Sequence, residues 1–169
     1  MIHLYIGDGK GKSCAAAGSV LRLLSAGYNV LYVAFLKDGS SGELRWLAEN
    51  SSVKLLCQSG LKRFVKDLES EEYQKTVEAQ RELLESAVLN KDNYQAVVFD
   101  ELTDVIELGI IDMKRVKEAI KSLGSDYEII ITGHQPLSAL IDLADYYTEF
   151  VSHKHPYNKG KKARRGVEF

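Results

Sequence analysis

The sequence has few of the residues that would indicate a secreted or nucleic-acid-binding protein. Two cysteines in 169 residues are too few for a disulfide framework, which favours a reducing compartment. The formal net charge is −2, so the chain has no overall basic excess that would attract nucleic acid or an anionic membrane. Hydrophobic residues make up 45% and charged residues 27%, a composition typical of a globular protein and not of a disordered one.

Long apolar runs are also missing. No stretch approaches the roughly 18 apolar residues that a membrane-spanning helix needs. Met1 leads directly into the first expected strand, so we expect no leader segment. We therefore expect a cytoplasmic protein with neither a membrane nor a nucleic acid among its partners. Since no repeat or linker interrupts the chain, residues 1–169 are expected to form a single domain.

Short apolar runs alternate with amphipathic segments along the chain. The runs are nearly continuous, which is the pattern of strands covered on both faces. This order predicts an α/β fold with a mostly parallel central sheet and helices on both faces, a three-layer architecture of the P-loop NTPase (RecA-like) type. The expected strands are 2–6, 29–37, 53–58, 96–101, 128–133 and 146–154, and the expected helices are 12–26, 69–90, 112–123 and 137–145.

A glycine-rich loop lies between the first strand and an alanine-rich helix, and it reads Gly7-Asp8-Gly9-Lys10-Gly11-Lys12-Ser13. Ile6 stands where the usual phosphate-loop motif, G-x-x-x-x-G-K-[ST], has its first glycine. Glycines here let backbone N–H groups converge on an anion, and the helix N-terminus adds partial positive charge. We expect Lys12 to neutralise phosphate oxygens, with Lys10 as a second cation, and the Ser13 hydroxyl to ligate Mg²⁺.

Other interpretations of this loop fit less well. A surface turn with incidental lysines would not require strand, glycines, Gly-Lys-Ser and helix to occur in this order. The dinucleotide pattern G-x-G-x-x-G fails, because position 12 is a lysine. Cys14 opens the helix, where a thiolate would be favoured, but no base is near it in sequence. We interpret Cys14 as a small packing residue rather than a nucleophile.

Two acids, Asp100 and Glu101, end the expected strand at 96–101. Acids at the carboxyl end of a buried parallel strand lie at the edge where α/β proteins bind ligands. One of them can hold or orient the metal of a phosphate site, and the alternative is a solvated strand end. His134 follows the strand at 128–133 at the same edge, where it is either a phosphate or metal-shell contact or an ordinary loop histidine.

The end of the chain is basic. The last twelve residues hold five Lys or Arg against one Glu, so any tendency to bind anions is concentrated there. A solvated charged terminus is the alternative interpretation.

Four stretches together resemble the cob(I)alamin (corrinoid) adenosyltransferases of the CobA/BtuR/CobO type, a P-loop family. They are the short glycine loop at 7–13, the acidic strand end Asp100–Thr103, the strand end Ile131–Gly133 and the closing stretch Lys154–Phe169. The resemblance extends over nearly the whole chain. The closing stretch is its most specific part, because phosphate loops occur in many families.

The resemblance implies transfer of the 5′-deoxyadenosyl group of ATP to the Co(I) of a reduced corrinoid such as cobalamin, with release of triphosphate. Since Co(I) is itself the nucleophile, the protein needs no side-chain nucleophile and no general base. A leaving triphosphate instead calls for positive charge and N–H donors. The family also implies a homodimer and a flavodoxin-type reductant.

Carried onto this sequence, the resemblance makes Lys12 and Glu101 catalytic and assigns Mg²⁺ or Mn²⁺ to Ser13, Glu101 and, less directly, Asp100. The implied nucleotide contacts are Gly7, Asp8, Gly9, Lys10, Gly11, Lys12, Ser13, Cys14, His134, Lys154, Lys162 and Arg164.

The sequence departs from the family pattern at three places. Ser13 and Cys14 stand where two threonines are frequent, and His134 stands where an arginine is frequent. The stretch 59–67 lacks the tryptophan of the phenylalanine–tryptophan pair that helps enterobacterial-type members strip the lower axial ligand from cobalt. These departures leave other functions open. One is a P-loop ATPase or small-molecule kinase that cleaves the γ-phosphate, and another is a non-catalytic carrier or an RNA-binding module that uses the basic tail.

Overall fold

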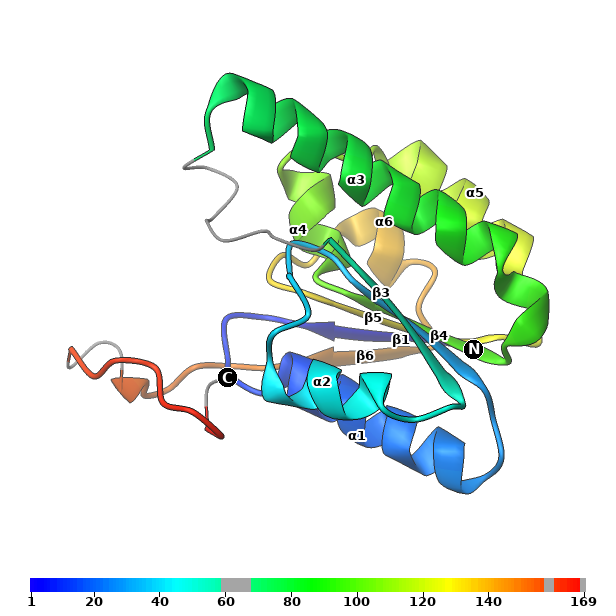
Figure 1. The fold of residues 1–169 in the computed structure, drawn as a ribbon, viewed down its shortest axis with the longest axis horizontal. Helices are drawn as coiled ribbons and strands as arrows, with labels where there is room; N and C mark the ends of the chain where they lie inside the picture. Colours follow the sequence, from blue (N-terminus) through cyan, green and yellow to red (C-terminus); the bar gives the residue numbers. More distant parts are fainter. Residues whose placement is uncertain (59–67, 157–159, 168–169) are drawn as a thin grey trace.

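A computed structural model of the chain describes residues 1–58, 68–156 and 160–167. Within these ranges the centre of the molecule is a six-stranded, all-parallel sheet in the order β3-β2-β4-β5-β1-β6 (Figure 1). The expected parallel α/β sheet is confirmed. The strands are β1 Ile2–Ile6, β2 Val30–Ala34, β3 Val53–Cys57, β4 Ala96–Asp100, β5 Glu128–Gly133 and β6 Tyr146–Glu149.

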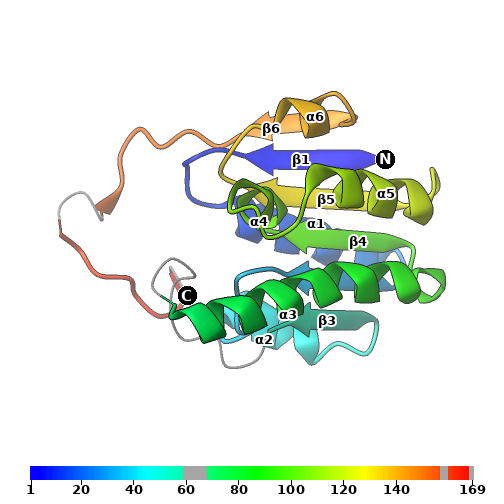
Figure 2. The same ribbon diagram turned by 90° about the horizontal axis from the view of Figure 1, so that it is seen from above.

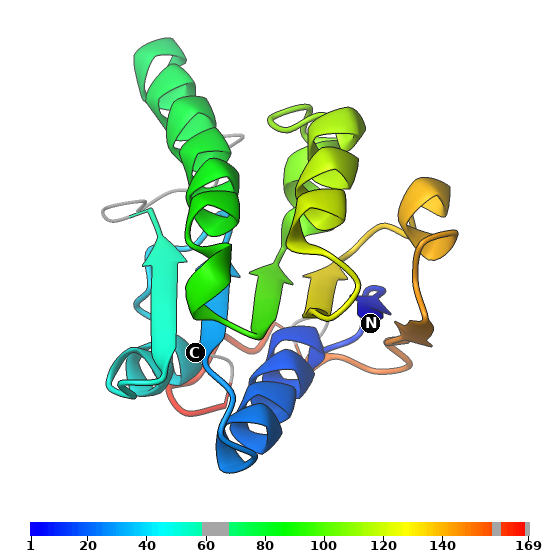
Figure 3. The same ribbon diagram turned by 90° about the vertical axis from the view of Figure 1, so that its right-hand side faces the viewer.

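Helices cover both faces of the sheet and give three layers (Figures 1 and 3). One face carries α1 Lys12–Ser25 and α2 Gly42–Ala48. The other carries α3 Ser70–Leu89, α4 Leu102–Glu107, α5 Met113–Leu123 and α6 Ser138–Ile141, with a 3₁₀ turn, η2 Lys91–Asn93, after α3. No helix in the described part of the chain has both the length and the apolar content to cross a membrane.

The central strands β2 and β4 are buried along their whole length. Alternate side chains of β2 enter different cores: Leu31 and Val33 pack with α3, α4 and α5, while Val30 and Tyr32 pack with α1 and α2. Each such buried aliphatic side chain stabilises the fold by roughly 1.5–3 kcal/mol. Burial on both faces explains why these segments read as continuous apolar runs and not as alternating ones.

Two strands end several residues earlier than expected, and the first of them, β2, ends at a turn whose residues are as apolar as the strand. β2 ends at Ala34 and not at Lys37, because Phe35 and Leu36 form a turn in which Leu36 adopts a φ of 54°. The last strand ends at Glu149, well before residue 154. The helices α2 and α4 were not expected, since seven and six residues are too few to establish a helical period.

All strands end at one edge of the sheet, because the sheet is parallel. Figure 2 shows the strand ends on one side, where the chain after β6 also leaves the sheet. The loop before α1 and the N-terminus of α4 lie at this same edge, since they directly follow β1 and β4. Side chains from distant parts of the sequence can therefore meet there.

Gly133, the last residue of β5, allows α4 to approach the sheet. A Cβ at this position would lie 1.8 Å from Thr103 Oγ1. We expect Gly133→Ala to lower the free energy of unfolding by about 1–3 kcal/mol, because the added methyl group overpacks this contact. Gly18 is the matched control, since it lies within α1 and a methyl group added there would have nothing within 4 Å of it.

Gly18→Ala should raise the free energy of unfolding by about 0.5–1 kcal/mol, because alanine is the better helix former. Urea unfolding of both variants measures these changes. Equal stability of the two variants would contradict the close packing of α4 against the end of β5.

Candidate nucleotide and metal site

The glycine loop packs tightly against the backbone that follows β6. A Cβ on Gly7 would lie 2.3 Å from the Phe150 carbonyl oxygen, and one on Gly9 would lie 2.6 Å from the Phe150 carbonyl carbon. The Gly9 N–H donates to the Phe150 carbonyl at 2.7 Å, and the Phe150 N–H donates to the Ile6 carbonyl at 2.7 Å. The Gly9 N–H was expected to face an anion, but it is engaged by the protein instead.

The N-terminus of α1 supplies the donors that remain at this loop. Gly11 precedes the helix with a φ of 112°, a conformation that favours glycine. The N–H groups of the first turn have no acceptor within the helix, so they can face a ligand. The Lys12 ammonium donates to the Gly9 carbonyl at 3.0 Å, which keeps it beside the loop. Burial lowers the pKa of Lys12, although the nearby carboxylates, first Asp104, oppose this effect.

Asp100 is a fully buried carboxylate at the end of β4. Its Oδ1 accepts hydrogen bonds from the Ser13 hydroxyl at 2.9 Å and the Thr132 hydroxyl at 2.6 Å. Its Oδ2 accepts one from the Lys37 ammonium at 2.6 Å. The predicted proximity of Ser13 and Asp100 is therefore observed, and Asp100 has its acceptor sites directed at protein donors.

Lys37 is the residue of this cluster that the sequence analysis missed. Its Nζ also lies 3.1 Å from Ser13 Oγ and 3.4 Å from Glu101 Oε1, and its side chain is only 19% exposed. Burial lowers the pKa of Lys37, but Asp100 and Glu101 outweigh it and the net pKa is raised, so the ammonium is charged. A signal existed, because Lys37 follows a buried apolar run toward the same sheet edge as Asp100.

Glu101 connects β4 to α4 in an unusual backbone conformation. Its φ of 64° is left-handed, and its N–H donates to the Thr132 hydroxyl at 2.9 Å. Burial raises the pKa of the Glu101 carboxyl, while the Lys37 ammonium acts in the opposite direction. The side chain is 29% exposed, unlike that of Asp100. Glu101 is therefore the acid of this pair that a ligand at the edge of the sheet can reach.

A Mg²⁺ or Mn²⁺ ion fits this cluster only when phosphate and water complete its coordination. Within the described ranges, no group of three His, Cys, Asp or Glu side chains could hold a metal ion. Mg²⁺ typically takes one or two carboxylates and keeps substrate phosphates and waters as its other ligands. The Ser13 hydroxyl donates a hydrogen bond to Asp100, so the lone pairs of its oxygen remain available for a cation. Ser13 and Glu101 can therefore serve as ligands of the metal ion.

His134 pairs with an acid that the sequence analysis did not single out. Its Nδ1 lies 2.8 Å from Asp104 Oδ1, on α4. This hydrogen bond raises the pKa of His134, and burial opposes the effect. The Asp104 Oδ2 is buried and has no hydrogen-bond partner among the described residues. His134 therefore lies at the predicted edge, beside the Asp100 cluster and not bonded to it.

The remaining predicted contacts lie outside this cluster. Cys14 is exposed in the first turn of α1, so its interpretation as a packing residue is wrong. Lys154, Lys162 and Arg164 are exposed on the segment that leaves the carboxyl edge after β6 (Figure 2). A hydrogen bond joins this segment to the glycine loop, because the Ser152 N–H donates to Asp8 Oδ1 at 3.1 Å. The departure noted at 59–67 lies outside the described residues.

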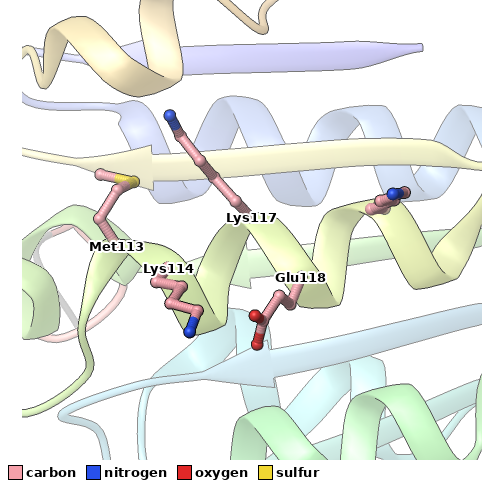
Figure 4. A pocket seen from close by; sticks show the side chains of 5 residues that line it. Met113, Lys114, Lys117 and Glu118 are labelled. Atoms are coloured by element: carbon pink, nitrogen blue, oxygen red, sulfur yellow. The ribbon is translucent and has the colours of Figure 1, made fainter.

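A separate hollow of about 380 Å³ lies on the surface of α5. Figure 4 shows that its lining comes from this one helix, with Lys117 and Glu118 pointing to opposite sides. None of the lining residues belongs to the Asp100 cluster. They are Met113, Lys114, Lys117, Glu118 and Lys121.

The fold and this edge define an α/β protein of the P-loop class, with a glycine loop leading into a helix opposite an acidic strand end. The chain belongs to the family described as ATP:corrinoid adenosyltransferase BtuR/CobO/CobP, whose model matches residues 1–169. The family resemblance noted in the sequence is confirmed.

Individual relatives extend this comparison. The chain is 31% identical to the corrinoid adenosyltransferase of Pseudomonas aeruginosa over 175 residues, which cover 100% of this chain and 83% of that protein. It is 29% identical to the corrinoid adenosyltransferase of Escherichia coli K12 over 171 residues, covering 100% and 85%. An uncharacterised Nostoc protein is 32% identical over 186 residues, covering 99% of this chain and 48% of that protein. The chain thus spans about half the length of the Nostoc relative.

The His134–Asp104 pair should make stability depend on pH. Because the folded-state pKa of His134 is raised, its stabilising effect is complete below the ordinary value of about 6.5 and is lost as pH rises through the folded-state pKa. We expect His134→Asn to lower the free energy of unfolding at about pH 6 and to have little effect at about pH 9.

Urea unfolding across this pH range measures the effect. His153→Asn is the matched control, since His153 is exposed on the segment after β6. A destabilisation by His134→Asn that stayed constant with pH would contradict the assigned ion pair.

Proposed function

We propose that this chain is an ATP:corrinoid adenosyltransferase that moves the 5′-deoxyadenosyl group of ATP to the Co(I) of a reduced corrinoid and releases triphosphate. Membership of the family and the names of relatives at about 30% identity support the proposal. The structural observation that carries it is the grouping of Lys12, the α1 N-terminus and the Ser13–Asp100–Glu101 cluster at one edge. This grouping suits the binding of a highly charged anion.

The chemistry requires no nucleophile from the protein. The electron pair of Co(I) attacks C5′ of ATP and forms the cobalt–carbon bond, while the C5′–O5′ bond breaks and leaves its electron pair on the triphosphate. No proton has to move. The protein accelerates this step by stabilising the negative charge that develops on O5′ and by holding the triphosphate in place. Lys12, Lys10 and the N–H groups at the start of α1 are the groups proposed for this task.

The metal is proposed to act on the same anion. Mg²⁺ or Mn²⁺ held by Ser13 and Glu101 would neutralise part of the triphosphate charge. Asp100 would orient the Ser13 hydroxyl, because Asp100 Oδ1 accepts a hydrogen bond from that hydroxyl at 2.9 Å. The Thr132 hydroxyl stabilises this arrangement, since it donates to Asp100 and accepts from the Glu101 N–H.

Further contacts and partners follow from the family. We propose that residues 7–14 surround the triphosphate, with His134 beside them and Lys154, Lys162 and Arg164 approaching when nucleotide binds. A homodimer of single-domain chains and a flavodoxin-type reductant that supplies Co(I) complete the proposal. The composition of the basic segment supports a phosphate-binding role, because the last twelve residues hold five Lys or Arg against one Glu.

The alternative is a P-loop ATPase or small-molecule kinase that cleaves the γ-phosphate. The pairing of Ser13 with Asp100 favours it, because the same pair orients the metal in such enzymes. A product assay separates the two functions. Incubation with MgATP and chemically reduced cobalamin should yield adenosylcobalamin and triphosphate, whereas ADP and phosphate as the sole products would establish the alternative.

Lys12 provides a second test. Lys12→Ala should lower kcat by about 10²–10³-fold, because it removes a charge directed at the leaving group. The melting temperature should change little, since the Lys12 side chain makes its hydrogen bond to a loop carbonyl and lies outside the hydrophobic cores. Lys54→Ala, at an exposed position of β3, is the matched control and should retain full activity. Near-normal turnover of Lys12→Ala would refute the assigned role.

A further inference from the structure

Unusual backbone conformations in the described residues lie beside the Asp100 cluster. The non-glycine residues with a left-handed φ in these ranges are Leu36, at 54°, and Glu101, at 64°. Leu36 directly precedes Lys37, and Glu101 directly follows Asp100. Such conformations are disfavoured for residues with a Cβ and persist only where surrounding contacts enforce them. Both therefore serve to place the charged groups of this cluster.

A chain of side-chain hydrogen bonds supports the turn at Leu36. The Leu36 N–H donates to the Gln80 side-chain oxygen at 2.9 Å, and Gln80 is fully buried on α3. The Gln80 amide nitrogen donates to the Gln58 oxygen at 2.7 Å, and the Gln58 nitrogen lies 3.2 Å from Thr76 Oγ1. Gln80 and Thr76 are buried, and burying polar side chains is costly unless they are hydrogen-bonded. This network thus holds the turn that directs Lys37 toward the carboxyl edge.

The Lys37 ammonium contacts the groups proposed to hold the metal. It donates hydrogen bonds to Ser13 Oγ at 3.1 Å and Asp100 Oδ2 at 2.6 Å, and it forms an ion pair with Glu101 Oε1 at 3.4 Å. Lys37 is therefore the cation that balances the two carboxylates, and it uses a lone pair of Ser13 that a metal ion would also need.

We propose that Lys37 is a positioning residue that competes with the metal for Ser13 and Glu101 and moves its ammonium onto the triphosphate when metal and nucleotide bind. An ammonium and a divalent cation repel each other and cannot both bind the Ser13 oxygen. The flexible four-carbon stem of lysine allows the ammonium to move to a phosphate oxygen without a backbone change. This inference rests on the proposed function, because it requires a bound triphosphate group.

The consequence is that metal and triphosphate bind as a unit. A metal ion alone must displace the Lys37 ammonium from Ser13 and Glu101 while that ammonium remains close to it, so the repulsion between the two cations opposes binding of the metal. A metal ion that arrives with triphosphate supplies phosphate oxygens for the displaced ammonium, so its binding is favoured. Lys37 thus creates a positive coupling between the two ligands, which is reciprocal by thermodynamic necessity.

Lys37→Met tests this coupling without any corrinoid. Binding of Mn²⁺ alone is followed by the electron paramagnetic resonance of free Mn²⁺. Binding of inorganic triphosphate is followed by calorimetry, first with a chelator and then with saturating Mn²⁺, and the ratio of the two affinities is the coupling factor. We expect the variant to bind Mn²⁺ alone about tenfold more tightly, because two carboxylates have lost their resident cation. The coupling factor should be about tenfold smaller in the variant, because no displaced ammonium remains to contact a phosphate oxygen. Weaker or unchanged Mn²⁺ binding would overturn the proposal.

Further variants separate charge from structure. Lys37→Arg keeps the charge and should retain the weak Mn²⁺ binding of the native protein, while Lys54→Met, at an exposed position of β3, should behave as the native protein in both assays. If Lys37→Met does not fold, Lys37→Gln removes the charge, keeps hydrogen bonds to the carboxylates and carries the same expectations. Tighter binding of Mn²⁺ alone together with a smaller coupling factor supports the proposal. Weaker binding of Mn²⁺ alone, or an unchanged coupling factor, would indicate a purely structural role and overturn it.

The amide network has its own test. Gln80→Leu removes the acceptor of the Leu36 N–H. It should change the Mn²⁺ affinity and the coupling factor in the same directions as Lys37→Met, by smaller amounts. Unchanged affinities in Gln80→Leu would overturn the role of the turn at Leu36. Since no measurement here follows adenosyl transfer, failure of the product assay and failure of this proposal are distinguishable.

Discussion

The burial of one carboxylate, that of Asp100, organises the carboxyl edge of the sheet. A charge that is fully removed from water must be paired and hydrogen-bonded, or it destabilises the fold by several kcal/mol. Its three donors come from α1, from the turn after β2 and from β5. Satisfying Asp100 therefore holds three separate segments together. The need to pair the Asp100 carboxylate also places Ser13, the proposed metal ligand, and Lys37, the proposed resident cation.

A second constraint acts on the glycine loop. Gly7 and Gly9 allow the loop to lie against the backbone of Phe150, which directly follows the edge strand β6, and the Gly9 N–H donates to the Phe150 carbonyl. The glycines thus have a packing reason in addition to any contact with phosphate. The loop is one residue shorter than the usual phosphate-loop motif, and its backbone is hydrogen-bonded to the segment after β6. The phosphate-facing role then falls on the start of α1 and on the lysine side chains.

Much of the fold was predictable from the sequence, because a strand covered on both faces must be apolar at consecutive positions. β2, β4 and β5 were recognised in this way, and the meeting of Ser13 and Asp100 followed from the geometry of a parallel sheet. Short elements such as α4 were missed, since their length carries no periodic signal. The turn at Leu36 was missed because its residues are as apolar as the strand before it. The His134–Asp104 pair joins segments 30 residues apart, and neither residue signals the other.

The sequence by itself determined the parallel α/β architecture and the family, because hydrophobic periodicity and an extended motif are properties of local sequence. The tertiary structure decided which donors and charges face one another at the carboxyl edge. Lys37 reaches Asp100 from a turn in which Gln80, 44 residues beyond Leu36 in the sequence, accepts the Leu36 N–H. Such a contact arises from the packing of α3 on the sheet, and no local pattern encodes it.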